Sequence, residues 1–278
     1  MNEFTNDGFT FDVTEAGSSS DDLIVLLHGF PESRASWTAV TPRLVQAGYR
    51  VLAPDQRGYS RGARPAARRA YTVDKLGNDI IAMVDQAGAD RFHVVGHDWG
   101  GMVAWELAAN HAERVKTVTS ITTPHPRALA KSTMRSSQLL KSSYAGFFQL
   151  PALPEWSLTN PLVSKRTWAT LAKSGLSEEY IAQYRALMQE PGAARGALNW
   201  YRAVPLQAPT GIGTINIPTM YVYGTKDFAL GRTAADLTGD YVTGPYRYEI
   251  LEGASHWIPE ELPDRTAELV VDFVKSVS

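Results

Sequence analysis

The strongest chemical signal in the sequence is an aspartate held between glycines, in the segment GHDWGG at 96–101. The segment follows an apolar run and precedes a helix-like pattern. Glycine at both flanks permits a turn too tight for side chains, and such a turn presents its central residue as a nucleophile. The N-terminus of the following helix would stabilise a carboxylate or an oxyanion beside it. We therefore interpret Asp98 as the nucleophile rather than as a simple helix cap.

An aspartate at this position indicates a different reaction from the serine found in most such turns. A carboxylate that attacks an ester carbonyl would form an energy-rich anhydride. A carboxylate that attacks an sp³ carbon instead forms an alkyl ester, which water can then hydrolyse. The sequence therefore predicts a substrate with a departing heteroatom, either an epoxide or an organohalide.

The expected partners of the nucleophile follow it in the chain order nucleophile, acid, histidine. Asp227 lies in YGTKDF at 223–228, after an apolar run, and is the candidate orienting acid. His256 lies in GASHW at 253–257 and is the candidate base that activates water. The backbone amides of Phe30, in HGFPES at 28–33, and of Trp99 are expected to form an oxyanion hole. The other five histidines are interpreted as structural.

The elements that must position these residues alternate between strand and helix. Short apolar, β-branched runs predict strands at 23–27, 50–53, 92–95, 116–121, 219–223 and 246–251. Helical patterns lie at 38–47, 73–87, 102–110 and 264–275. This alternation predicts an α/β fold with a mostly parallel, doubly wound sheet.

The middle of the chain interrupts this rhythm. From 126 to 213 there is no clear apolar strand, and helix-like stretches rich in aromatic residues are punctuated by prolines. We expect a first part of the core at 1–125, a helical cap insertion at 126–213 and a second part of the core at 214–278. The cap should lie over the carboxyl ends of the strands, where open α/β sheets bind ligands.

Composition narrows the possible partners. A formal net charge of −2, from 27 basic and 29 acidic side chains, gives no electrostatic reason to expect nucleic acid. No apolar run approaches the ~18 residues of a membrane span, and the polar N-terminus predicts no secretory signal. The chain has no cysteine, which excludes disulfides and fits a cytoplasmic location. Without a metal-ligand cluster or a phosphate-binding loop, we expect no metal and no cofactor besides water.

Taken together, these motifs resemble those of the epoxide hydrolases of the α/β-hydrolase fold, in their short bacterial form. The shared motifs, in order, are HGFPES at 28–33, DQRGYS at 55–60, GHDWGG at 96–101, KDF at 226–228 and SHW at 255–257. Two further segments, SYAGFFQ at 143–149 and ALNWYR at 197–202, resemble those that carry the family's acid tyrosines. The resemblance implies that Tyr144 and Tyr201 hydrogen-bond the epoxide oxygen, and that the bond between Phe30 and Pro31 is cis.

The predicted substrate is a small lipophilic epoxide. Aromatic side chains are expected to form an apolar pocket around it: Phe30, Trp99, Phe148, Trp200 and Phe228. A departing alkoxide needs a proton, which a phenol can donate, whereas a halide leaves unprotonated. Two alternatives stay open at this point: a dehalogenase acting on haloalkanes or haloacids with the same triad, and a non-catalytic ligand sensor.

Overall fold

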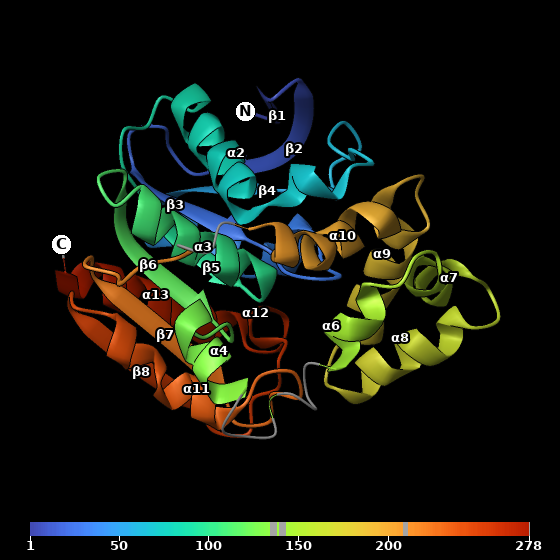
Figure 1. Ribbon diagram of the computed structural model, residues 1–278. Coiled ribbons are helices and arrows are strands. Elements are labelled where there is room, and N and C mark those ends of the chain that lie inside the picture. Colours follow the sequence, from blue (N-terminus) through green and yellow to red (C-terminus); the bar gives the residue numbers. More distant parts are fainter. Residues whose placement is uncertain (134–137, 139–142, 208–210, 278) are drawn as a thin grey trace.

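The computed structural model describes residues 1–133, 138, 143–207 and 211–277. Its centre is an eight-stranded sheet with the order β1-β2-β4-β3-β5-β6-β7-β8 (Figure 1). The strands are β1 (Glu3–Asn6), β2 (Phe9–Ala16), β3 (Asp22–Leu27), β4 (Tyr49–Pro54), β5 (Phe92–His97), β6 (Val115–Ile121), β7 (Thr219–Gly224) and β8 (Tyr246–Leu251). The α/β sheet predicted from the sequence is thereby confirmed.

The strands from β3 to β8 run parallel, and the six strands expected from apolar runs are all among them. The N-terminal strands β1 and β2 were not predicted. They form an antiparallel hairpin, and β2 pairs antiparallel with β4. The hairpin turns at Asp7 and Gly8, both with positive φ, which suits a tight two-residue turn.

Both faces of the sheet are covered, as the continuously apolar strands indicate. In β3, Leu23, Val25 and Leu27 belong to one buried cluster and the intervening Ile24 and Leu26 to another. Successive strand side chains point to opposite faces, so an unbroken apolar run buries both.

Helices from distant parts of the chain complete the two layers. The cluster that contains Leu23 continues into α2 (Val73–Gln86) and α3 (Trp99–Asn110). The cluster on the other face is closed by η1 (Arg34–Trp37), α1 (Thr41–Gln46), α12 (Ile258–Glu261) and α13 (Pro263–Val277). The carboxyl ends of the parallel strands are thus left for the loops and for the cap.

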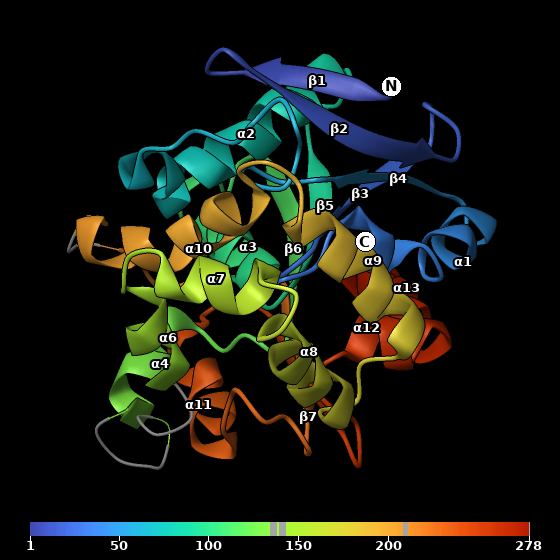
Figure 2. The same cartoon turned by 90° about the vertical axis from the view of Figure 1, so that its right-hand side faces the viewer.

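The cap helices lie between β6 and β7 in the chain and stand to one side of the sheet in Figure 1; Figure 2 views the molecule from that side. They are α6 (Ser143–Phe148), α7 (Leu153–Thr159), α8 (Ser164–Lys173), α9 (Glu178–Met188) and α10 (Ala193–Ala203), followed by η3 (Val204–Leu206). Hydrogen bonds fasten them to the core. The indole of Trp200 donates to the carbonyl of Arg57 at 2.7 Å, and Tyr184 donates to Glu260 at 2.9 Å.

The cap boundaries at 126 and 213 stay a prediction. The expected range includes residues 134–137, 139–142 and 208–210, which lie outside the described residues. At its start, α4 (Pro126–Thr133) packs against α11 (Arg232–Asp236) and η4 (Thr238–Tyr241). Among the described helices, none is long and apolar enough to cross a membrane.

Candidate active site

Asp98 lies in the tight turn between β5 and α3, in a backbone conformation that non-glycine residues rarely adopt, with φ 48° and ψ −120°. The glycines around it are required by space. A Cβ on Gly96 would lie 2.1 Å from the carbonyl oxygen of Gly100, and a Cβ on Gly100 would lie 2.1 Å from that of Leu27. The hydroxyl of Thr123 donates to the carbonyl of Asp98 at 2.6 Å, which helps to hold the turn.

The loop after β3 reaches the carboxylate of Asp98 with a backbone amide. The N–H of Phe30 donates to Oδ1 of Asp98 at 2.9 Å. The loop approaches so closely that a Cβ on Gly29 would lie 2.4 Å from the Cβ of Asp98. The bond between Phe30 and Pro31 is cis, as the family resemblance implies. The structure therefore puts one expected oxyanion donor in contact with Asp98; the amide of Trp99 as the second stays a prediction.

The predicted acid and base are brought together beside the nucleophile. His256 is 2 % exposed, and its Nδ1 lies 2.8 Å from Oδ2 of Asp227. Its Nε2 faces the nucleophile, 3.6 Å from Oδ2 of Asp98. The second oxygen of Asp227 accepts the backbone N–H groups of Ala229 and Leu230 at 2.7 and 2.9 Å. These bonds fix the direction of the Asp227 carboxylate, which in turn orients the imidazole.

Opposite charges in this arrangement govern its protonation. Burial disfavours the imidazolium, but the Asp227 carboxylate, with Asp98 beside it, outweighs burial and holds the pKa of His256 well above its ordinary value. Burial also disfavours the charged form of Asp98 and so raises its pKa, but His256 and the amide of Phe30 lower that pKa below its ordinary value. Asp98 is therefore ionised at neutral pH and available to attack an electrophile.

A buried polar cluster lies behind the imidazole and was not found from the sequence. His97, which was interpreted as structural, has Nδ1 2.8 Å from Oε1 of Glu32 and Nε2 2.8 Å from the carbonyl of His256. Burial lowers the pKa of His97, but Glu32 outweighs it and the net shift is upward. Glu32 also accepts the N–H of Gly29 at 2.8 Å. This cluster therefore connects the loop that carries Phe30 to the loop that carries the base.

Glu260 lies close to Glu32 and His97, and the side chains of the three residues have polar atoms within 4.8 Å of one another. Both nitrogens of His97 already contact oxygen acceptors, and Glu260 accepts the hydroxyl of Tyr184. The three residues thus form a compact polar cluster behind the imidazole of His256.

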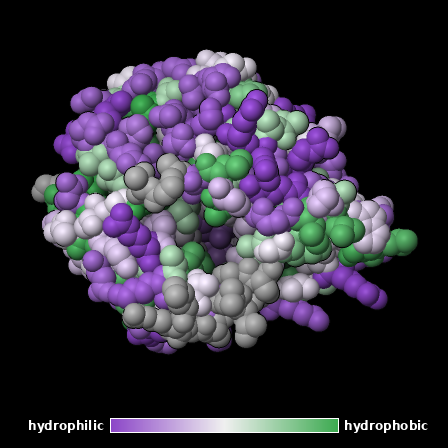
Figure 3. Space-filling view, viewed as in Figure 1, coloured by the Kyte–Doolittle hydropathy of each residue, from purple (hydrophilic) through white to green (hydrophobic). Residues whose placement is uncertain are grey.

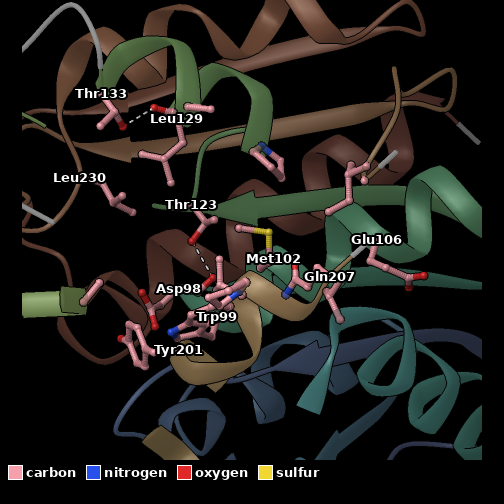
Figure 4. A pocket seen from close by; sticks show the side chains of 18 of the residues that line it. Asp98, Trp99, Met102, Glu106, Thr123, Leu129, Thr133, Tyr201, Gln207 and Leu230 are labelled. Carbon is pink, nitrogen blue, oxygen red and sulfur yellow. Dashed lines mark hydrogen bonds between the residues drawn. The ribbon is translucent and has the colours of Figure 1, made fainter. Parts of the chain in front are cut away.

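Tyr144 and Tyr201 converge on the nucleophile from two cap helices, α6 and α10. Their rings meet edge-on, with centroids 6.0 Å apart. Both line the same cavity as Asp98 and Trp99, and Figure 4 shows Tyr201 beside Asp98. Burial, together with the nearby carboxylate of Asp98, holds the pKa of both phenols above the ordinary value. Both hydroxyls are therefore protonated and able to donate at neutral pH.

The cavity that these residues share has a volume of about 780 Å³, within the range of small-molecule sites. It appears as a hollow in the centre of the face shown in Figure 3. Its walls include aliphatic residues that the sequence did not single out: Met102, Leu129, Val204, Ile212 and Leu230. Met102 could have been predicted to line the cavity, because it lies one helical turn after Asp98 on α3.

The expected aromatic pocket requires correction, because only Trp99 of that set lines the cavity. Trp200 is 1 % exposed and packs behind Trp99, and its indole N–H donates to the carbonyl of Arg57 in the core. Phe228 is 43 % exposed and lies against the ring of His256, outside the cavity. Phe30 and Phe148 are packed against Tyr201 and support it.

A strained nucleophile turn, an amide donor and an acid–base pair, all at the carboxyl ends of a parallel sheet, define the hydrolases of the α/β class. Residues 22–263 match the model of the alpha/beta hydrolase fold family, and the chain belongs to this family.

Curated relatives confirm the more specific resemblance to epoxide hydrolases. The chain is 35 % identical to Epoxide hydrolase 4 of Homo sapiens, over 96 % of the chain and 76 % of that protein. It is 31 % identical to Epoxide hydrolase A of Mycobacterium tuberculosis, over 96 % of the chain and 94 % of that protein. It is also 38 % identical to the AB hydrolase superfamily protein YfhM of Bacillus subtilis, over 99 % of the chain and 98 % of that protein.

Among solved structures, the crystal structure of Epoxide Hydrolase A from Mycobacterium thermoresistibile superimposes with a TM-score of 0.86 at 30 % identity. The match covers 99 % of this chain and 98 % of that one.

Proposed function

We propose that this protein hydrolyses an epoxide to a vicinal diol through an ester intermediate on Asp98. The observation that supports this most directly is the convergence of two protonated phenols, Tyr144 and Tyr201, on the cavity that also exposes an ionised carboxylate nucleophile. An epoxide needs both a nucleophile for its carbon and an acid for its oxygen. The relatives named epoxide hydrolases point to the same substrate class.

In the first step, an oxygen of Asp98 attacks one ring carbon and the bond between that carbon and the ring oxygen breaks. The oxygen receives a proton from Tyr144 or Tyr201, because an unprotonated alkoxide in an apolar cavity would be strongly disfavoured. The products are an alkyl ester on Asp98 and a phenolate, which lies beside the ring of the second tyrosine.

Ester formation also prepares the base for the second step. The ester carries no charge, so one of the two carboxylates that hold the pKa of His256 high is lost. His256 then releases its proton, which solvent returns to the phenolate, and becomes a neutral base. It deprotonates a water that attacks the ester carbonyl, while the amides of Phe30 and Trp99 stabilise the oxyanion. Collapse breaks the bond to the alkyl oxygen, which takes the proton from His256 as the diol leaves. The remaining proton of the water, now on the Asp98 carboxyl group, passes to His256 and restores the starting charges.

A dehalogenase with the same triad is the alternative reaction. A halide leaves without a proton and is stabilised by N–H donors instead. Here the ring of Trp99, one candidate donor, packs edge-on against the ring of Tyr201 with centroids 4.9 Å apart, and position 30 offers only an apolar phenyl ring. The site is therefore better equipped for a departing alkoxide than for a halide.

One turnover in heavy-oxygen water tests the covalent step, with styrene oxide as substrate and 1-chlorobutane assayed in parallel. With enzyme in excess, the first diol should carry unlabelled oxygen from Asp98, and later turnovers should carry the solvent label. His256→Gln should accumulate protein plus one substrate by mass spectrometry, whereas the control Asp98→Ala should form no adduct. Solvent label in the first diol would refute the nucleophile, and chloride release without diol would favour the dehalogenase.

A further inference from the structure

A mostly buried arginine joins the two cap helices that carry the tyrosines. Arg202 follows Tyr201 directly on α10, and its side chain is 11 % exposed. Its Nε donates to the carbonyl of Phe148, the last residue of α6, at 2.9 Å, and its Nη2 donates to the carbonyl of Leu150 at 2.7 Å. Carbonyl groups at the C-terminal end of a helix lack intrahelical partners, and a basic side chain can replace them. Arg202 therefore caps the helix on which Tyr144 lies.

A carboxylate fixes the guanidinium of Arg202 in this position. Its Nη1 and Nη2 donate to the two oxygens of Glu155 on α7, at 2.6 and 2.9 Å, and form a bidentate pair. Burial raises the pKa of Glu155, but Arg202 outweighs burial and the net shift is downward, so the pair is charged at neutral pH. One side chain thus connects α6, α7 and α10, which pack together in the cap (Figure 2).

Two neighbouring side chains strengthen this junction between α6 and α10. The side-chain amide of Gln149 donates to the carbonyl of Tyr201 at 2.8 Å. The ring of Phe148 contacts both phenol rings, with its centroid 5.6 Å from that of Tyr144 and 4.8 Å from that of Tyr201. Tyr144 lies one helical turn before Phe148, so the junction sets the distance between the two phenols.

Tyr201 is held by the core independently of Arg202. Its ring packs edge-on against the ring of Trp99, with centroids 4.9 Å apart, and its helix is hydrogen-bonded to the loop after β4. Within the described part of the chain, the aromatic contacts of Tyr144 are with other residues of the cap. Loss of the Arg202 guanidinium should therefore displace Tyr144 and leave Tyr201 in place.

We infer that Arg202 is a positioning residue for ring opening, which holds Tyr144 at the distance from Tyr201 where both phenols can donate to one epoxide oxygen. The donors of Arg202 are directed to protein oxygens, and the residue is not among the described ones that line the cavity. Its effect on the reaction therefore passes through Tyr144. This inference rests on the proposed function, because two donors need a common acceptor only when the substrate carries such an oxygen.

A double-mutant cycle tests this route, with pre-steady-state alkylation of Asp98 by styrene oxide as the readout. Arg202→Lys keeps the charge but loses the planar, bidentate geometry of the guanidinium. In the Tyr201→Phe background, where Tyr144 is the remaining acid, this change should slow alkylation by about tenfold or more. In the Tyr144→Phe background it should cost less than about twofold, because the phenol that it positions is already gone. Hydrolysis of a preformed ester should change little in either background.

Arg64→Lys is the matched control for loss of a guanidinium that joins the cap to the core. Arg64 is 7 % exposed and, like Arg202, donates to two backbone carbonyls and one glutamate, those of Tyr59 and Pro191 and the side chain of Glu190. These bonds lie near the start of α10 rather than at its end. Any loss of rate from Arg64→Lys should therefore be the same in the two tyrosine backgrounds.

An equal loss in both backgrounds for Arg202→Lys would overturn the inference, because the arginine would then act on the cap as a whole. So would an unchanged rate in the Tyr201→Phe background. If urea unfolding shows that Arg202→Lys is not folded, Glu155→Gln takes its place, since it releases the guanidinium and should give the same asymmetry. Wild-type enzyme that forms no ester with styrene oxide would refute the proposed function itself, whereas an active enzyme without the asymmetry refutes only the role of Arg202.

Discussion

The identity of one side chain determines which bond this site can break. In the same turn a serine would serve acyl transfer, whereas in the proposed mechanism Asp98 forms an ester that remains hydrolysable because its electrophile is an sp³ carbon. The same proposal requires His256 for release of the ester rather than for the attack on the epoxide. The geometry is compatible with these two separate roles, since Nε2 of His256 lies 3.6 Å from Oδ2 of Asp98 and leaves the carboxylate free to reach a carbon.

The two cap tyrosines should be partly interchangeable, and this gives the first prediction at the residue scale. Tyr144→Phe and Tyr201→Phe should each leave partial activity, because the remaining phenol can still protonate the alkoxide. The double change removes the general acid, which is worth about 10²–10⁴ in rate, and should cost more than the sum of the single changes. Pre-steady-state alkylation of Asp98 by styrene oxide measures this step directly.

Hydrolysis of a preformed ester should respond much less to the same double change, which provides an internal control. A double variant that alkylates Asp98 at nearly the wild-type rate would remove the main support for epoxide chemistry.

Individual site residues differed in how far the sequence could predict them. Asp98, Asp227 and His256 could be found because each follows a strand in a fixed chain order, and strand ends meet at one edge of a sheet. Trp200 was placed in the pocket wrongly, because residue type does not tell which face of α10 a side chain occupies. The role of Glu32 as a partner of His97 was missed, since it depends on a contact between residues 65 positions apart.

At the scale of elements, the position of α10 depends on a contact between two glycines. A Cβ on Gly196 would lie 2.6 Å from the Cα of Gly58 and 2.7 Å from its carbonyl oxygen. Gly58 itself has φ 95°, a conformation that favours glycine. The helix that carries Tyr201 therefore rests directly on the loop after β4, with no room for a side chain.

Gly196→Ala should consequently move α10 and displace Tyr201, which lies five residues later in the same helix. We expect alkylation of Asp98 to slow by about tenfold or more, because small displacements of positioned groups carry large kinetic costs. Stability should fall by about 1–3 kcal/mol from overpacking. Stopped-flow alkylation and urea unfolding measure the two effects.

Gly146→Ala on α6 is the matched control for stability, since a Cβ there would meet no described atom within 4 Å; it is not a control for alkylation, because Gly146 lines the cavity. In a helix this change should be neutral or stabilising, by up to about 1 kcal/mol. Equal stability of the two variants in urea unfolding would show that α10 has room for a methyl group at Gly196.

The elements themselves were predictable where burial leaves a simple pattern. Strands such as β3, β4 and β7 are mainly apolar and almost wholly buried, because both faces of the sheet are covered there, whereas β8 is partly polar and half-buried. The hairpin of β1 and β2 was missed although Asp7 and Gly8 supply its turn, because β2 alternates apolar and polar residues and resembles a loop when only long apolar runs are sought. The contacts that orient the cap helices join distant segments and leave no local pattern.

At the scale of the whole molecule, buried titratable groups make stability depend on pH even though the net charge is only −2. Several of these titratable groups lie behind the active site, in the cluster of Glu32, His97 and Glu260. This cluster also joins the cap to the core, because Tyr184 of α9 donates to Glu260. The protonation state of Glu260 therefore affects the stability of the contact between cap and core.

Replacement of Glu260 by glutamine provides the prediction at this scale. Burial, then the nearby Glu32, raises the pKa of Glu260 to about 8 from an ordinary value of 4.5. Between these values the folded protein keeps a proton that the unfolded chain has released, so stability falls as pH rises and this contribution is lost by about pH 8. In Glu260→Gln that loss is absent, while the amide oxygen can still accept the hydroxyl of Tyr184. Relative to wild type, the variant should gain up to about 1.4 kcal/mol per pH unit across this window.

Urea unfolding at a series of pH values from acid to mildly alkaline measures the difference. Glu268→Gln is the control, because it removes one negative charge from a side chain that is 57 % exposed on α13, and so reports the loss of a surface charge together with its ion pair to Arg265. The curves of wild type and Glu260→Gln should converge toward the acid end and separate as pH rises, with the variant the more stable. Parallel curves would mean that Glu260 is ionised in the folded protein, and that His97 rather than a bound proton neutralises the pair of carboxyl groups beneath the base.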